Sequence, residues 1–337
     1  MVINDSQLKD TISKIEKKYG EGAIHKGSDA HKIERISTGS LELDFITGGG
    51  IPKGRWSRAW GPWSSAKTLT CWNIIREAQK QGLSCAYYNV EKSFDREYVE
   101  SLGVDIDNLY IIEGSDIEGI AGKIEALLQS INLHVIDTAS AACSIDELKS
   151  DMEDWHMALN ARVWSKALRK LGDRFDKDEN IGIFVDQARI ALSMYGGPEV
   201  PPGGKSIEHA SSLTLHFRRG KWLYRTASGD LSDDKDKREN KSSSDPDGIE
   251  IQVRTEKSKV CVPLRSARLH LDFSIKNFDP YFELAKFAIY FGLAKASGSW
   301  YELPSGEKLQ GKSGLRGKII QDQKLCDEIR AETLLQA

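Results

Sequence analysis

Short apolar runs alternate with helix-like stretches between about residue 55 and residue 219. The runs at 55–60, 84–90, 133–139, 181–187 and 212–219 predict strands, and helical patterns lie between them, including one from about 146 to 175. Strands that are apolar almost throughout and alternate with helices are typical of a parallel sheet covered on both faces. Right-handed crossovers bring the carboxyl ends of such strands to one edge, where ligands bind. We therefore predict an α/β fold with a mostly parallel twisted sheet.

An amphipathic segment precedes the alternating region. Leu8, Ile12, Ile15 and Tyr19 are four, three and four residues apart, with charged residues between them. This spacing predicts a helix with one apolar stripe. Two interpretations stay open: the stripe packs on its own domain, or it docks on a neighbouring molecule.

The character of the sequence changes after Arg219. Residues 227–248 are charged, serine-rich and almost free of apolar side chains, which predicts a mobile surface loop. Next, "IEIQVRTEKSKVCVPL" and "ARLHLDF" predict antiparallel strands, and the chain from about 277 predicts a helix, a glycine break and a hairpin. We expect three parts: 1–32 as a helix and linker, 33–275 as the core, and 276–337 as a small α+β domain.

The composition limits the possible partners. With 47 Lys and Arg against 50 Asp and Glu, the net charge is -3, so any site for a polyanion must be local. The five cysteines form no C-x-x-C pair and predict reduced core residues. No apolar run approaches the ~20 residues that a bilayer requires, and we expect a cytoplasmic protein with no membrane contact.

The stretch "GPWSSAKT", residues 61–68, follows a predicted strand and begins a predicted helix. In that position backbone N–H groups and the helix N-terminus face phosphates. Lys67 would reach the β and γ phosphates of a nucleotide, and Thr68 would bind Mg²⁺. The other expected phosphate-binding positions of this loop are Gly61, Pro62, Ser64, Ser65 and Ala66.

The loop departs from the pattern G-x-x-x-x-G-K-S/T at Ala66 and carries a bulky Trp63. The added methyl group leaves the N–H of residue 66 in place. The loop can therefore still bind phosphate if the φ angle of residue 66 tolerates a side chain. If φ is positive there, alanine costs about 1 kcal/mol. We expect ATP to bind and its hydrolysis to be slow.

Two carboxylates follow predicted strands at the same edge of the sheet. Asp137 ends one strand and is a candidate for the magnesium shell, although an Asp in that place is more often a helix cap or turn residue. Glu91 follows another strand and is a candidate general base, the alternative being a solvated loop residue. Their combination with the loop at 61–68 favours a nucleotide site.

Seven motifs follow one another in an order that resembles the bacterial RecA family of ATP-dependent DNA strand-exchange recombinases. Besides "GPWSSAKT", the stretches are "ISTGSLELDF", "LGVDIDNL", "HMALNARVWSKALRKL", "FVDQARI", "MYGGPEVPPGGKSIEHASS" and "GSWYELPSGEKLQGK". The resemblance runs from about Leu8 to Leu335. It implies a P-loop ATPase core, ATP and Mg²⁺ as cofactors, and a homo-oligomeric helical filament that pairs single-stranded DNA with homologous duplex DNA.

The resemblance also assigns roles around the nucleotide. It makes Lys67 and Thr68 nucleotide and magnesium residues, Glu91 the catalytic carboxylate, and Asp137 the second magnesium-shell acid. The further positions that it implies are Asp95 and Tyr98 beside adenine, Gln187 as the sensor of the γ-phosphate, and Lys257 and Lys259 as a pair that reaches the nucleotide of the adjacent subunit.

Two DNA-binding loops are implied by the same resemblance, at about 149–162 and 188–204. Arginines there would neutralise phosphates, apolar side chains would insert between bases, and glycines would let the backbone approach the strand. For the helical arginines, a solvated helix face is the open alternative. The implied residues are Met157, Arg162 and Arg169 for the first loop, and Arg189, Met194, Tyr195, Gly203 and Gly204 for the second.

Several positions differ from what is usual in the family. Asn89 stands where an acidic residue is common, Glu208 where a lysine is common, and His209 where an aromatic residue is common. Two functions therefore stay open: a DNA-dependent ATPase that catalyses strand exchange, or a RecA-like filament or DNA-binding paralogue that has lost effective hydrolysis and acts as a regulator.

Overall fold

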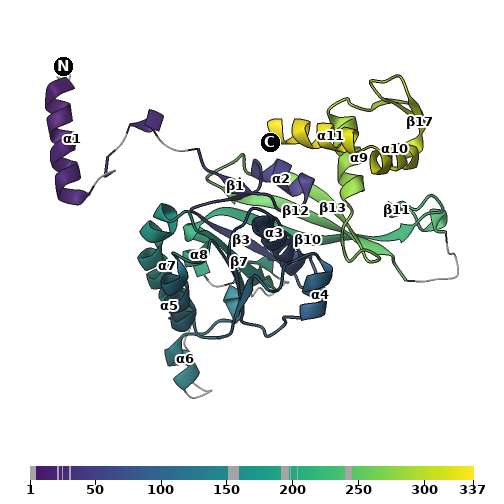
Figure 1. The fold of residues 1–337 in the computed structure, drawn as a ribbon. Helices are drawn as coiled ribbons and strands as arrows, with labels where there is room; N and C mark the ends of the chain where they lie inside the picture. Colours follow the sequence, from purple (N-terminus) through teal and green to yellow (C-terminus); the bar gives the residue numbers. More distant parts are fainter. Residues whose placement is uncertain are drawn as a thin grey trace. The chain divides into compact units, whose positions relative to one another are not determined.

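The computed structural model describes residues 5–20, 23–24, 26–29, 32–150, 159–190, 197, 199–202, 204–239 and 245–337. The chain forms two units, Met1–Glu34 and Arg35–Ala337. The first contains α1 (Asp5–Tyr19) and a short 3-10 helix, Gly27–Asp29 (Figure 1). The predicted N-terminal helix is thus confirmed, with Ile12 and Ile15 partly buried and Leu8 and Tyr19 exposed.

The second unit is built on a ten-stranded sheet with the order β14-β13-β12-β10-β3-β7-β6-β4-β5, and β11 pairs with β10. Neighbouring strands from β10 to β5 pair in parallel, and β12, β13 and β14 continue the sheet antiparallel. The parallel strands are β3 (Trp56–Gly61), β4 (Cys85–Asn89), β5 (Leu109–Ile112), β6 (Leu133–Asp137), β7 (Ile181–Gln187) and β10 (Ser211–Arg225). The remaining strands of this sheet are β11 (Leu231–Ser232), β12 (Gly248–Ser258), β13 (Ser266–Asp272) and β14 (Asn277–Phe278).

Helices cover both faces of the parallel part, as predicted. One face of the parallel part packs against α3 (Lys67–Lys80) and α4 (Arg96–Ser101), and α2 (Leu41–Thr47) packs beside them on β12 and β13. The other face packs against α5 (Ile117–Leu127), α7 (Leu159–Lys177) and α8 (Gly204–Ala210). Gly182 shows how closely the second face packs, because a Cβ atom there would lie 2.1 Å from the ring of Trp56. The short elements beside this core are β1 (Arg35–Ile36), β2 (Ile51–Pro52), η2 (Ala139–Ala141), α6 (Ile145–Lys149), β8 (Arg189–Ile190), β9 (Glu199–Val200) and η3 (Lys235–Lys237).

Two expectations about element boundaries were wrong. The helix predicted over 146–175 is two helices, α6 and α7, because Ser150 already has an extended backbone after α6. The segment 227–248 was expected to be a mobile loop, but part of it packs. Leu231 is buried as β11 pairs with β10, and the guanidinium of Arg238 lies 4.3 Å from the ring centre of Tyr224. A single apolar residue and a cation–π contact thus anchor a segment whose composition predicted a mobile surface loop.

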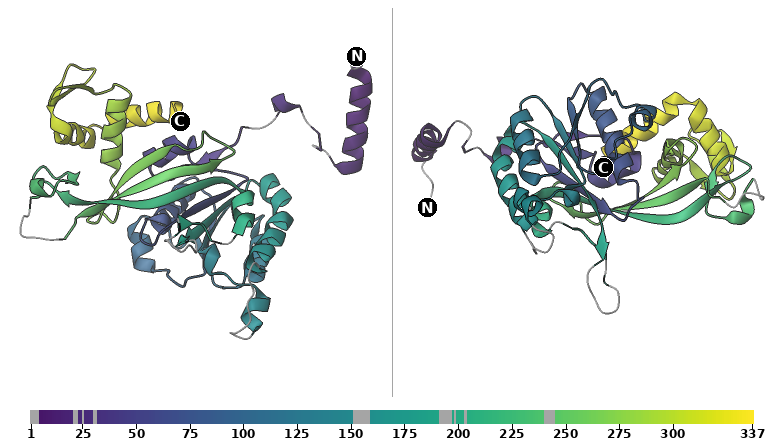
Figure 2. Two further views of the ribbon diagram at one scale, coloured as in Figure 1. Left: turned by 180° about the vertical axis from the view of Figure 1, so that it is seen from behind. Right: turned by 90° about the horizontal axis from the view of Figure 1, so that it is seen from below.

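The C-terminal segments pack around an apolar cluster of their own over the antiparallel strands (Figure 2). They comprise α9 (Pro280–Tyr290), α10 (Gly311–Gln321), α11 (Gln323–Leu335) and a small sheet of β15 (Lys295–Ser297), β16 (Trp300–Glu302) and β17 (Lys308–Gln310). The helix, glycine break and hairpin predicted here are all present. No helix in the described part of the chain is long and apolar enough to cross a bilayer.

A buried pair of acids joins α2 to α9. Glu283 is almost fully buried and accepts hydrogen bonds from Ser40 Oγ at 2.9 Å and from the N–H of Glu42 at 3.1 Å. The carboxylate of Glu42 pairs with Lys286 Nζ at 2.7 Å. Burial, and then the charge of Glu42, raise the pKa of Glu283 from 4.5 to about 8.

This pKa predicts that the protein loses stability as the pH rises. The folded state favours the protonated form of Glu283. The stability that this preference contributes is therefore complete below about pH 4.5 and is lost as the pH rises through about 8. Glu283→Gln stays neutral, and its melting temperature should fall less between pH 5 and pH 8 than that of the parent, by a few degrees. Calorimetry of the parent, of Glu283→Gln and of the exposed control Glu97→Gln measures this; identical pH profiles for all three would contradict it.

Candidate nucleotide site

The phosphate loop, residues 61–68, connects β3 to α3 and wraps around the amino group of Lys67. Lys67 Nζ donates to the carbonyl oxygens of Gly61 at 3.0 Å and Pro62 at 2.7 Å. Only 6% of Lys67 is exposed, and burial lowers its pKa, against the opposing effect of Asp137 and Glu91. The loop therefore holds one buried cation, enclosed by its own carbonyl groups, at the N-terminus of a helix, where anions bind favourably.

The backbone at Ala66 has φ 65° and ψ 21°, the left-handed conformation that disfavours a side chain. Ser64, in the same loop, has φ 53°. Residue 66 caps α3 without a side-chain hydrogen bond. The methyl group of Ala66 is thus a source of strain, and not merely added volume.

The tryptophans near the loop lie in different environments. Trp56 stacks on Phe175 at 4.2 Å between ring centres, Trp60 on His216 at 3.9 Å, and Trp72 packs against Tyr87. Trp63 is 65% exposed, and Arg219 lies 4.4 Å from its ring centre.

Asp137 joins the loop to the neighbouring strands. Its Oδ2 accepts hydrogen bonds from Thr68 Oγ1 at 2.7 Å and from the Tyr87 hydroxyl at 3.0 Å. Burial raises the pKa of Asp137, and the two hydrogen bonds oppose that shift. The hydroxyl of Thr68 and the carboxylate of Asp137 are hard oxygen groups in contact, which is the kind of donor set that suits Mg²⁺.

Glu91 is held in place by two side chains. Its Oε1 accepts from Thr138 Oγ1 at 2.8 Å and from Gln187 Nε2 at 3.1 Å. Gln187 ends β7, and Thr138 follows directly after β6. The ends of two parallel strands therefore position this exposed carboxylate.

A cleft of about 210 Å³ brings these groups together. Its walls include every residue from Trp63 to Thr68, with Glu91, Asp137, Thr138 and Gln187. The candidate phosphate-binding, metal-binding and acid–base residues thus lie together at one sheet edge, and the sequence analysis did not name Thr138 and Tyr87. The only sequence signal for Tyr87 was its position in a strand at the same sheet edge.

The predicted adenine-side and adjacent-subunit residues lie elsewhere. The carboxylate of Asp95 caps α4 by accepting from the N–H of Tyr98 at 3.0 Å, and Tyr98 is partly buried. Lys257 Nζ donates to the carbonyl of Glu208, and Lys259 Nζ donates to that of His209 at 3.2 Å. None of these four side chains lines the cleft.

The expected DNA-binding residues are described only in part. Met157, Met194, Tyr195 and Gly203 lie outside the described residues. Arg162 and Arg169 are exposed on α7, while Arg189 is exposed on β8, which pairs with β9. Gly204 begins α8 with φ 69°, where a Cβ atom would lie 3.0 Å from that of Ala161.

A buried ion pair behind the site was also missed. Arg58 Nη2 lies 2.6 Å from Asp186 Oδ2 with both side chains fully buried, and it donates to the carbonyl of Pro202 at 2.6 Å. Burial raises the pKa of Asp186 to about 6, against the effect of Arg58. The sequence indicated this pair only by a single charged residue in each of two apolar strands, Arg58 in β3 and Asp186 in β7, with charges of opposite sign.

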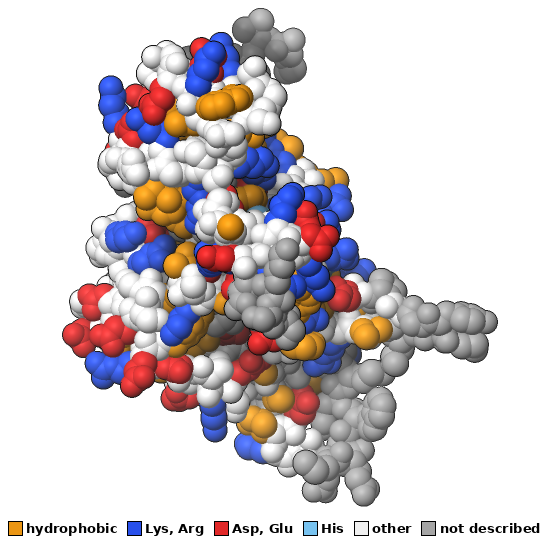
Figure 3. All heavy atoms as spheres, turned by 90° about the vertical axis from the view of Figure 1, so that its right-hand side faces the viewer, with side chains coloured by type: hydrophobic (Ala, Val, Ile, Leu, Met, Phe, Trp, Pro, Cys, Tyr) orange, Lys and Arg blue, Asp and Glu red, His pale blue; other side chains and the backbone are white. Residues whose placement is uncertain are grey.

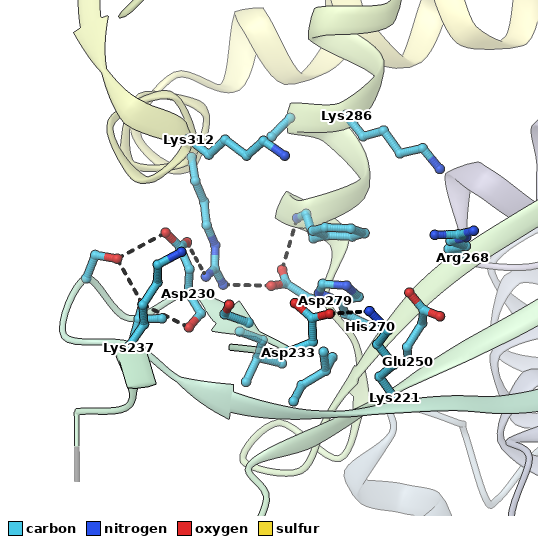
Figure 4. A pocket seen from close by; sticks show the side chains of 18 of the residues that line it. Lys221, Asp230, Asp233, Lys237, Glu250, Arg268, His270, Asp279, Lys286 and Lys312 are labelled. Carbon is cyan, nitrogen blue, oxygen red and sulfur yellow. Dashed lines mark hydrogen bonds and ion pairs between the residues drawn. The ribbon is translucent and has the colours of Figure 1, made fainter. Parts of the chain in front are cut away.

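A second cleft, of about 890 Å³, is lined by residues of β10, β11, β12, β13, α9 and α10, among others, away from the nucleotide site (Figure 4). Much of its charge is paired internally: Arg316 contacts Asp230 at 3.0 Å and Asp279 at 2.9 Å, and Lys221 contacts Asp233. Basic and acidic side chains are also interspersed over the face in Figure 3. The described residues contain no cluster of acidic, His and Cys side chains suited to a metal.

Comparison with known proteins identifies the family. The family described as RecA N-terminal domain matches residues 6–276. Protein RecA of Thermus aquaticus is 33% identical over 336 residues, 98% of this chain and 94% of that protein. Protein RecA of Chlorobium limicola is 33% identical, and the match covers 96% of this chain and 89% of that protein. Protein RecA of Aquifex aeolicus is 34% identical, and the match covers 96% of this chain and 90% of that protein. The chain belongs to the RecA family, and near full-length similarity supports a recombinase function.

The strained alanine gives a direct test of the loop. Ala66→Gly should raise stability by about 0.5–1 kcal/mol, because glycine adopts positive φ without strain. It should also tighten nucleotide binding, since the loop no longer resists its working shape. Ala78→Gly, at a buried position in the last turn of α3, should lower stability. Thermal melts and calorimetric titration with ATP measure both effects; a less stable Ala66→Gly protein without tighter binding would show that the loop is adapted to alanine.

Proposed function

We propose that the protein is a DNA-dependent ATPase that forms helical filaments on single-stranded DNA and catalyses homologous pairing and strand exchange. The observation that carries the proposal is the hydrogen bond from Gln187 to Glu91. It connects the carboxylate beside the phosphate loop to the strand that leads into the second expected DNA loop, 188–204. This contact supports a connection between the proposed nucleotide site and the expected DNA loop.

Each residue of the cleft has a role in this proposal. The phosphate loop and Lys67 bind and orient the phosphates of ATP, while Thr68 and Asp137 hold Mg²⁺. When bound, Mg²⁺ neutralises charge on the β and γ phosphates. Glu91 orients the attacking water and accepts its proton. Gln187 reports the state of the γ-phosphate, because it contacts the same carboxylate.

The filament completes the site in this proposal. Lys257 is on β12 and Lys259 follows that strand; both side chains donate to carbonyls at the C-terminal end of α8, outside this chain's cleft, which supports a role at a neighbouring subunit's nucleotide. Asp95 and Tyr98 contact the adenine side. The exposed apolar residues of α1 support docking of residues 1–32 on a neighbour, with 33–275 as the ATPase core and 276–337 as the small domain.

Slow hydrolysis remains part of the proposal. The left-handed backbone of Ala66 supports it, since strain in the loop opposes the geometry that binds phosphate. The alternative, a regulator that has lost hydrolysis, is not favoured, because the chain matches recombinases over nearly its whole length.

Removal of the buried cation should abolish nucleotide binding. We expect Lys67→Ala to lose ATP affinity by at least about a hundredfold, together with DNA-stimulated hydrolysis and strand exchange, because Lys67 is the cation that the loop surrounds. Lys80→Ala, at the exposed end of the same helix, should behave like the parent. Hydrolysis and pairing assays with and without single-stranded DNA test this. If the parent pairs DNA equally well without nucleotide, an ATP-dependent recombinase is ruled out.

DNA binding should depend on a few local phosphate contacts. Arg162→Ala and Arg169→Ala should each weaken binding to all single-stranded sequences several-fold and reduce the salt slope by about 0.7. Arg174→Ala, on the same helix but 3.6 Å from Glu125, is the matched control. Fluorescence anisotropy over a salt series provides the measurement. Unchanged affinity in both variants would assign the arginines to a solvated helix face.

A further inference from the structure

Tyr87 lies behind the nucleotide cleft without lining it. It is fully buried on β4, and its ring packs against Trp72 with 4.2 Å between ring centres. Its hydroxyl donates to Asp137 Oδ2 at 3.0 Å. A phenol placed in an apolar cluster requires a partner for its O–H group, and here that partner is the proposed magnesium-shell acid.

Two donors hold one oxygen of this carboxylate. Thr68 Oγ1 approaches Oδ2 at 2.7 Å from the phosphate loop, and the Tyr87 hydroxyl approaches it at 3.0 Å from the neighbouring strand. Thr68 lines the cleft and belongs to the loop that must adjust to a ligand. Tyr87 belongs to the rigid sheet, because β4 is paired on both sides, with β5 and β6. The tyrosine thus supplies the anchor that does not move with the loop.

We infer that Tyr87 is a positioning residue of the magnesium site: its hydroxyl fixes the rotation of the Asp137 carboxylate, the group that would hold Mg²⁺. This inference rests on the proposed function. Outer hydrogen bonds of this kind orient metal-binding carboxylates, and their loss commonly lowers metal affinity at least tenfold. Tyr87 touches neither nucleotide nor metal, so it should act only through Asp137.

The same strand offers a matched control. Tyr88 is also buried, and its hydroxyl lies 3.1 Å from His134 Nδ1. It packs in the apolar cluster on the opposite face of the sheet from Tyr87. Tyr87→Phe and Tyr88→Phe therefore remove the same atom from the same strand, and only the first alters the surroundings of Asp137.

The experiment measures the affinity of the full-length chain for a non-hydrolysable ATP analogue by calorimetry, in EDTA and over a series of Mg²⁺ concentrations. In Tyr87→Phe, the Mg²⁺ concentration that gives half of the affinity gain should rise about tenfold. The affinity in EDTA should not change, and Tyr88→Phe should match the parent in both measurements.

Each other outcome overturns the inference in a recognisable way. An unshifted Mg²⁺ dependence in Tyr87→Phe, beside a normal Mg²⁺ response of the parent, refutes the role of Tyr87 and leaves the proposed function intact. Equal loss of affinity with and without Mg²⁺, or a variant that does not fold, assigns Tyr87 a structural role. A parent that binds no nucleotide, or binds it without regard to Mg²⁺, refutes the proposed function itself.

Discussion

Parallel pairing of β3, β7, β6 and β4 is the constraint on which the rest of the site depends. The register places Gly61 beside Gln187, and Asn89 beside Asp137, at the carboxyl ends of the strands. The phosphate loop, the carboxylate of Glu91 and the carboxylate of Asp137 follow from those ends. Glu91 and Gln187, which are 96 positions apart in the sequence, therefore meet within hydrogen-bonding distance.

Charged side chains are buried behind this edge, and their burial costs free energy. Lys67, Asp137, Arg58 and Asp186 are all buried, and burial alone disfavours each charge. Hydrogen bonds and ion pairs within the group offset that penalty. Arg58 also contacts the carbonyl of Pro202, so the sheet core and the end of the second expected DNA loop share one buried pair. Ala66 adds backbone strain to the same small region.

Much of this arrangement could be predicted from sequence because it follows from strand order. Apolar strands with helices between them define the parallel sheet, and residues directly after strand ends must meet at its edge. Side-chain partners such as Tyr87 with Asp137, or Thr138 with Glu91, depend on rotamers and on contacts across strands that periodicity does not contain. Leu231 is a similar case, because this one buried apolar residue anchors a segment whose composition predicts a mobile surface loop.

Asp95, Lys257 and Lys259 lie away from the cleft. Their proposed roles on the adenine side and in a neighbouring subunit require the nucleotide and the filament. The most direct test is an electron cryomicroscopy structure of the full chain with single-stranded DNA, Mg²⁺ and a non-hydrolysable ATP analogue. The account predicts a helical filament with the analogue held between Lys67 of one subunit and Lys257 and Lys259 of the next. A filament whose nucleotide contacts only one subunit, or nucleotide bound outside the phosphate loop, would contradict it.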